Sequence, residues 1–123
     1  MTVEYKPKIL GQAAEDAACT FLQTQGLSLL QKNFRCSCGE IDLIMQDRDE
    51  LIFVEVRLRH HSGHGNSLES INQQKQRKII KAALFYLQKK KLFDKVFCRF
   101  DVIGLDTNQK LSWVKNAFSA DFV

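Results

Sequence analysis

The chain has 123 residues, of which 45% are hydrophobic and one is proline, and it carries a net charge of +4. This length is enough for one domain with a real core and too short for two, so we expect a single domain over residues 1–123. No apolar run approaches the roughly 20 residues that span a bilayer, and the opening residues lack the apolar core of a signal peptide. We therefore expect a cytoplasmic protein with no membrane partner. The basic charge is compatible with a polyanionic partner.

The first half of the chain predicts one helix followed by three strands. Apolar residues recur every three or four positions from Ile9 to about Gln25, which indicates an amphipathic helix that ends at Gly26. Runs rich in apolar and β-branched residues predict strands over 27–36, 40–46 and 51–59. The last two are separated only by the charged segment DRDE, so we expect them to pair as a hairpin.

The second half predicts a long helix and one or two further strands. Ser70 and Gln73 have the spacing of a capping box, which predicts a helix through residues 71–91. An alternating run over 95–105 predicts a strand, and residues 110–118 a short last one. The order helix, three strands, helix, one or two strands is typical of an α/β fold with a mixed sheet flanked by helices.

Charged residues interrupt the second and third predicted strands. Because side chains alternate faces along a strand, Glu55 and Arg57 share one face of theirs, and Asp42 lies on that same face if the hairpin pairs Asp42 with Glu55. A buried carboxylate needs a cation, a metal or solvent beside it. The pattern leaves two interpretations open: a structural ion pair between Arg57 and one of the carboxylates, or a functional site.

The predicted helices place two further charged residues near this face. Winding the first helix at about 100° per residue puts Glu15 at the edge of the apolar stripe and Asp16 in solvent. The same winding puts Lys75 inside the apolar arc of the second long helix. A lysine there either extends along the apolar surface to solvent or reaches a partner in the sheet.

Five ordered blocks carry a resemblance to a known family: GQAAEDAACTFL, NFRCSCGEIDLI, LIFVEVRLR, QQKQRKIIKAA and CRFDVIGL. Over about Leu10 to Leu105 the chain resembles the YraN family of uncharacterised bacterial proteins. That family is similar in fold to the restriction-endonuclease-like nucleases, in particular to Holliday-junction resolvases. The resemblance therefore implies a restriction-endonuclease-like core with a mixed β-sheet flanked by helices.

The resemblance also implies a site. In that superfamily a helix glutamate, a strand aspartate and a following Glu-x-Lys surround a divalent metal, Mg²⁺ or Mn²⁺. Carried over to this chain, the metal ligands are Asp42 and Glu55, and the other catalytic positions are Glu15, Arg57 and Lys75. At position 57 arginine replaces the lysine, and an arginine is not deprotonated in a protein.

Three functional hypotheses follow. The first is a Mg²⁺-dependent endonuclease acting on branched or damaged DNA. The second is a module that binds DNA or other nucleic acid and has lost catalysis because of Arg57, and the third is a structural or interaction protein whose inner charges form ion pairs. The likeness to resolvases also makes a homodimer a candidate assembly. Residues expected to contact a nucleic-acid backbone are Arg35, Arg59, Arg77, Lys78 and Arg99.

The four cysteines predict free thiols in a reducing compartment. Cys36 and Cys38 with the histidines at 60, 61 and 64 raise the alternative of a zinc site. The C-x-C spacing is not the usual C-x-x-C of such sites, which disfavours this alternative.

Overall fold

A computed structural model describes residues 7–59, 71–106, 108 and 110–120 of the chain. Among them are two helices and five strands. Their bounds are α1 Pro7–Thr24, β1 Ser28–Cys36, β2 Gly39–Asp47, β3 Glu50–Arg59, α2 Gln73–Lys89, β4 Phe97–Asp106 and β5 Leu111–Phe118. This is the predicted order, and both of the C-terminal strands that the sequence suggests are formed.

The strands form one mixed sheet in the order β1-β2-β3-β4-β5. Neighbouring strands are antiparallel except for β3 and β4, which run parallel and are joined through α2. A parallel pair needs a crossover connection, and the helix supplies one. The order α-β-β-β-α-β-β and the flanked mixed sheet match the α/β fold class expected from the sequence.

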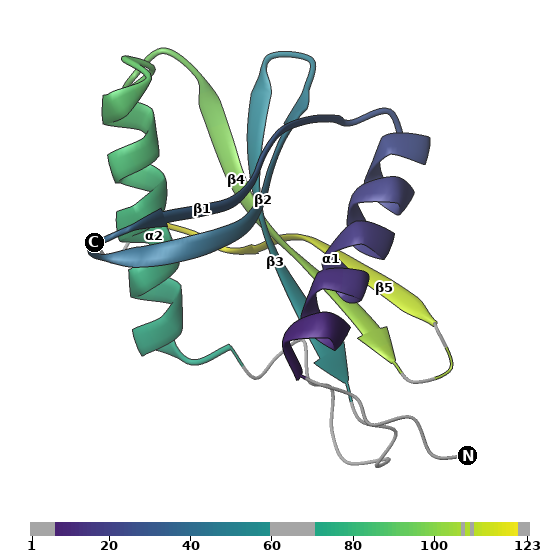
Figure 1. Cartoon of the computed structure of the whole chain (residues 1–123). Coiled ribbons are helices and arrows are strands. Elements are labelled where there is room, and N and C mark those ends of the chain that lie inside the picture. Colours follow the sequence, from purple (N-terminus) through teal and green to yellow (C-terminus); the bar gives the residue numbers. More distant parts are fainter. Residues whose placement is uncertain (1–6, 60–70, 107, 109, 121–123) are drawn as a thin grey trace.

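The two helices cover opposite faces of the sheet (Figure 1). On the α1 side, Ala18 and Leu22 pack with Leu43, Ile52 and Val54 in one buried cluster. On the α2 side a second buried cluster combines Ile80, Ala83 and Tyr86 of the helix with Ile44 and Phe53 of the sheet. The strands in the middle of the sheet therefore contribute apolar side chains to both layers, as their nearly continuous apolar sequences require.

The sheet opens between β2 and β3 at Leu43. Pairing between these strands begins at the pair Asp47–Glu50 and ends at the pair Leu43–Val54. On its other edge, β2 continues to pair with β1 as far as Gly39. Residues before Leu43 in β2 thus pair on one side only. In Figure 1 this end of the β1–β2 hairpin lies near α2. We call the point where the two strands separate the fork.

The first turn of α2 corrects one prediction. The N-cap is Asn72, whose side-chain Oδ1 accepts a hydrogen bond from the backbone N–H of Lys75 at 2.8 Å. The predicted capping box with Ser70 and Gln73 is wrong, because Gln73 is the first helical residue and Asn72 already satisfies a free N–H of the first turn.

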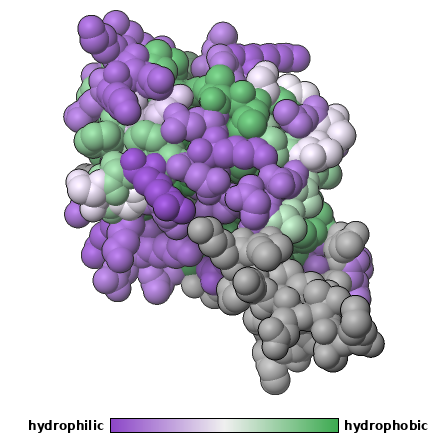
Figure 2. All heavy atoms as spheres, viewed as in Figure 1, coloured by the Kyte–Doolittle hydropathy of each residue, from purple (hydrophilic) through white to green (hydrophobic). Residues whose placement is uncertain are grey.

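The side of the molecule that Figure 2 shows is largely hydrophilic, with smaller apolar areas between the polar side chains. Neither α1 nor α2 combines the length and the apolar character that crossing a bilayer demands.

Candidate functional site

Asp42 and Glu55 lie next to each other at the fork. The last pair of the β2–β3 ladder joins Leu43 to Val54, so the next residue on each strand is one of the two carboxylates. The Asp42 carboxylate Oδ2 accepts a hydrogen bond from the backbone N–H of Val56 at 2.8 Å. This bond fixes Asp42 against β3 where the strands separate. Glu55 is only 7% exposed. The ladder ends before these two residues, and their side chains have different partners: Glu55 pairs with Lys75 of α2, whereas Asp42 hydrogen-bonds with Glu15 of α1. That the two carboxylates share one face of the sheet stays a prediction from the hairpin register.

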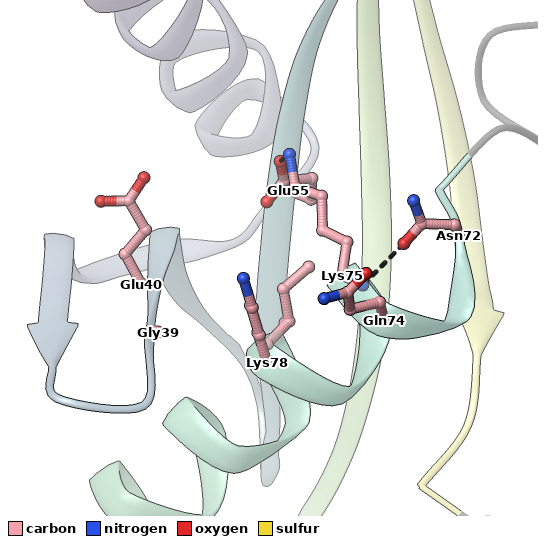
Figure 3. Close-up of a pocket in the computed structure, with 8 residues that line it drawn as sticks. Gly39, Glu40, Glu55, Asn72, Gln74, Lys75 and Lys78 are labelled. Carbon is pink, nitrogen blue, oxygen red and sulfur yellow. Dashed lines mark hydrogen bonds and ion pairs between the residues drawn. The ribbon is translucent and has the colours of Figure 1, made fainter.

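Lys75 supplies the cation for Glu55. Its Nζ lies 2.9 Å from Glu55 Oε1, and Figure 3 shows the side chain reaching from the first turn of α2 to β3. The ion pair that the sequence suggested between Arg57 and a carboxylate is not formed, because Lys75 is the partner of Glu55. Arg57 follows two residues later on the same face of β3 and is half-buried, and no described residue forms an ion pair with it.

Glu15 approaches the fork from α1. It is half-buried, whereas the neighbouring Asp16 is exposed, as the helical winding predicts. Its Oε1 is buried and has no hydrogen-bond partner among the described residues. Burial raises the pKa of the Glu15 carboxyl, while hydrogen bonds with the side chains of Asn33 and Asp42 act in the opposite direction.

The site has more negative than positive charge near Asp42. Burial first, and then repulsion from Glu55 and Glu15, raise the pKa of Asp42 from 3.8 to about 8, against the hydrogen bond from the Val56 N–H. At neutral pH Asp42 therefore holds a proton that a nearby cation would displace. Carboxylates with strongly raised proton affinity in a cleft are common at functional sites.

A pocket of about 350 Å³ lies beside Glu55, between β2, β3 and the start of α2 (Figure 3). Its polar lining consists of Glu40, Glu55, Asn72, Gln74, Lys75 and Lys78. Gly39 also lines it and packs tightly on α2, since a Cβ at this position would lie 2.7 Å from the Lys78 carbonyl oxygen. The glycine lets the β1–β2 turn come close enough to close one side of the pocket.

The described residues contain no group of three or more His, Cys, Asp or Glu side chains arranged to hold a metal ion by themselves. Magnesium does not require such a group, because it is usually bound by one or two carboxylates together with water and substrate phosphate. The adjacent Asp42 and Glu55, with a partnerless buried oxygen of Glu15 nearby, are a donor set of that kind. We conclude that the residues present fit a hard divalent cation.

The expected nucleic-acid contacts occupy different places. Lys78 lines the pocket. Arg77 is exposed on α2, and Arg35 is exposed on β1 beside Glu40 at 3.3 Å. Arg99 is 15% exposed and is bound to Glu50 at 2.7 Å and to Asp101 at 3.0 Å. Arg99 therefore belongs to a structural ion-pair network with Glu50 and Asp101. The side chain of Arg59 and the three histidines lie outside the described residues.

Sequence reasoning missed Asn33, Glu40, Asn72 and Gln74. Asn33 has a positive φ of 53°, which asparagine tolerates better than most residues, and its side chain hydrogen-bonds with Glu15. An asparagine inside a predicted strand was the one available signal for this role.

The fold and site define an α/β protein in which a mixed sheet opens between two antiparallel strands and holds a buried glutamate, paired with a helix lysine, close to a half-buried aspartate. Residues 14–105 match the model of "Uncharacterised protein family UPF0102". Proteins of that name from three bacteria are similar over most of their length. The one from Coxiella burnetii (strain RSA 331 / Henzerling II) is 47% identical, covering 92% of this chain and 94% of its own. The Herminiimonas arsenicoxydans protein is 48% identical, covering 92% of this chain and 89% of its own. The Pseudomonas putida KT2440 protein is 46% identical, covering 96% of this chain and 98% of its own. The chain belongs to the UPF0102 family, the YraN family that its sequence blocks resemble.

Proposed function

We propose that the protein is a nucleic-acid-binding endonuclease that hydrolyses phosphodiesters of DNA with Mg²⁺ or Mn²⁺. The observation that carries this proposal is the adjacency of Asp42 and Glu55 at the fork, with Lys75 Nζ 2.9 Å from Glu55. A pair of carboxylates with one cation beside an open pocket is the arrangement expected around a scissile phosphate. The same arrangement is costly for a fold that uses these residues only as scaffolding, because Asp42 has no cation of its own.

In this proposal Asp42 and Glu55 are the residues that hold the divalent cation. A bound Mg²⁺ supplies a Lewis acid for the phosphate and lowers the pKa of a water molecule that it carries. The chain prepares this role in two ways. The Val56 N–H orients Asp42 across the two strands, and Lys75 compensates the charge of Glu55.

Lys75 takes the position of the superfamily lysine in this proposal. Arg57 retains its positive charge at all relevant pH values, so it can bind a phosphate with two hydrogen bonds but does not accept a proton. Lysine exchanges protons more readily, and the amino group of Lys75 lines the same pocket as Glu55. β3 has an arginine where the superfamily has a lysine, and in this proposal α2 supplies the lysine instead.

The substrate class follows from the charges around the pocket. Lys78 lines it one helical turn beyond Lys75, and Arg77 and Arg35 are exposed on α2 and β1. Basic side chains so placed suit the phosphates of a nucleic-acid backbone. The resemblance to resolvases directs the proposal to branched or damaged DNA.

The second candidate is a DNA-binding module without turnover. The observation that favours it is Arg57, which removes the strand lysine, together with the engagement of Lys75 by Glu55. Both candidates require the same basic side chains for binding. They differ in the role of Asp42, which only the endonuclease needs, for cleavage.

The test is incubation of the protein with linear, flap and four-way-junction DNA in Mg²⁺ or Mn²⁺, with EDTA as a blank. We expect cleavage by the wild type that falls at least about 100-fold in Asp42→Asn and in Lys75→Met. Asp16→Asn is the matched control, since Asp16 is an exposed acid on α1, and Arg57→Lys should retain activity. Absence of cleavage by every form, Arg57→Lys included, contradicts the nuclease proposal. A salt-dependent gel shift that survives Asp42→Asn would then favour the binding module.

A further inference from the structure

Two cysteine thiols meet in the turn between β1 and β2. Cys36 is the last residue of β1, and Cys38 directly precedes Gly39, the first residue of β2. Their Sγ atoms are 2.7 Å apart, and the Cys36 thiol also donates a weak hydrogen bond to the Gly39 carbonyl oxygen at 3.5 Å. Both cysteines are half-buried and free. A disulfide bond is about 2.05 Å long, so the sulfurs need to approach by less than about 1 Å to be bonded.

The two thiols differ in their readiness to ionise. Burial opposes ionisation of Cys36, but hydrogen bonds from the Cys38 side chain and from the backbone of the turn outweigh it and lower the pKa of Cys36. The hydrogen bond with Cys36, together with burial, raises the pKa of Cys38. One thiolate with a protonated thiol beside it is the arrangement of a nucleophilic cysteine and its resolving partner.

We propose that Cys36 and Cys38 are a thiol modification site that forms a reversible disulfide within the turn and so controls the shape of the adjacent pocket. With hydrogen peroxide as oxidant, the Cys36 thiolate attacks one peroxide oxygen, the O–O bond breaks, and sulfenic acid forms, while the leaving hydroxide takes up the proton that the thiol had released and becomes water. The Cys38 sulfur then attacks the Cys36 sulfur, and the S–O bond breaks with release of a second water. The two thiols lose two electrons and two protons, and the peroxide is reduced to two molecules of water.

The turn is coupled to the pocket through direct contacts. Cys36 packs against the buried cluster that joins the sheet to Ile79 and Ile80 of α2, so bond formation changes the packing of the turn on that cluster. Gly39 is pressed against the Lys78 carbonyl and, with Glu40, lines the pocket. A shift of the turn therefore moves one wall of the pocket relative to the side chains of α2. Because cores are closely packed, such a shift is not absorbed locally.

The test uses the full chain treated with hydrogen peroxide and then with dithiothreitol. We expect a mass loss of about 2 Da, a peptide in which residues 36 and 38 are linked, and full reversal by the reductant. Cys36→Ser and Cys38→Ser should each abolish the link, while Cys98→Ser should leave it unchanged. Hydrogen exchange of the first two turns of α2 should differ at least about threefold between the reduced and oxidised wild type.

Two results would overturn the proposal. If both thiols remain open to alkylation after peroxide treatment, the modification site does not exist. If the disulfide forms and α2 exchanges at an unchanged rate, the control of the pocket is wrong. None of these readouts uses DNA or a metal, so they are independent of the proposed endonuclease activity.

Discussion

Asp42 binds its proton more tightly than an exposed aspartate because it is buried and faces two other carboxylates. The folded-state pKa of about 8 lies above the value of 3.8 that applies when the chain is unfolded. Between these two values the folded protein retains a proton that the unfolded chain has lost. The free energy of unfolding therefore decreases as the pH rises through this window, and the loss is complete above it. In the proposed cation site, a bound ion would offset this loss of stability.

Replacing Asp42 by asparagine should remove this pH dependence. The amide keeps an oxygen for the Val56 N–H and carries no charge, so Asp42→Asn should be more stable than the wild type at pH 9 by about 1 to 3 kcal/mol. The difference should shrink towards pH 4. Urea denaturation of both proteins at several pH values measures it, with Asp49→Asn, the replacement of an exposed aspartate in the β2–β3 turn, as control. A difference that stays constant with pH would show that Asp42 ionises normally.

The ion pair of Lys75 and Glu55 joins a half-exposed cation to a buried anion, with side-chain exposures of 49% and 8%. Removing the cation in Lys75→Met leaves Glu55 without its partner, and we expect a loss of about 1 to 2 kcal/mol. Glu55→Gln in the Lys75→Met background should recover part of it, because the buried charge is gone. A double-mutant cycle by denaturation measures the coupling, and Lys78→Met is the control. Strictly additive effects would contradict a direct interaction.

At the scale of elements, the site depends on how the β1–β2 turn meets α2. Gly39→Ala places a methyl group 2.7 Å from the Lys78 carbonyl oxygen, so the turn and the helix must separate. We expect a loss of about 1 to 3 kcal/mol in the free energy of unfolding. The matched control is Gly11→Ala, where a Cβ meets nothing within 4 Å inside a helix and should be neutral or stabilising. Equal stability of the two variants would mean that the close approach of turn and helix is unimportant.

Much of this element pattern was predictable from the sequence. Sequence patterns predicted both helices and four of the strands and left the fifth as a possibility, because local sequence sets which face of an element is apolar. The Asp42 and Glu55 adjacency followed from one assumption about hairpin register, and the inward direction of Lys75 from helical winding. The cap at Asn72 and the positive φ of Asn33 did not follow. The position of a helix cap and a local departure from strand conformation both depend on tertiary packing, which a local sequence pattern does not contain.

At the scale of the whole molecule, the topology assembles the site from distant parts of the chain. The two helices lie on opposite faces of the sheet (Figure 1). Glu15 of α1 hydrogen-bonds with Asp42, and Lys75 of α2 pairs with Glu55, so both helices contribute to the fork. Sequence alone placed each of these residues on a face of its own element, and only the resemblance to a family brought the helix residues and the strand residues to one site. Their convergence is a property of the mixed sheet, in which the α2 crossover precedes the parallel strand β4.

The most direct test of the central claim is a calorimetric titration of the wild type with Mn²⁺ at pH 7, in two buffers of different ionisation enthalpy. Because Asp42 is protonated at that pH, the account predicts one bound ion per chain and release of about one proton for each ion bound. Asp42→Asn should lose the binding, whereas Asp16→Asn should keep it. Binding that releases no proton, or that is equally strong in Asp42→Asn, would contradict a cation site built on Asp42 and Glu55.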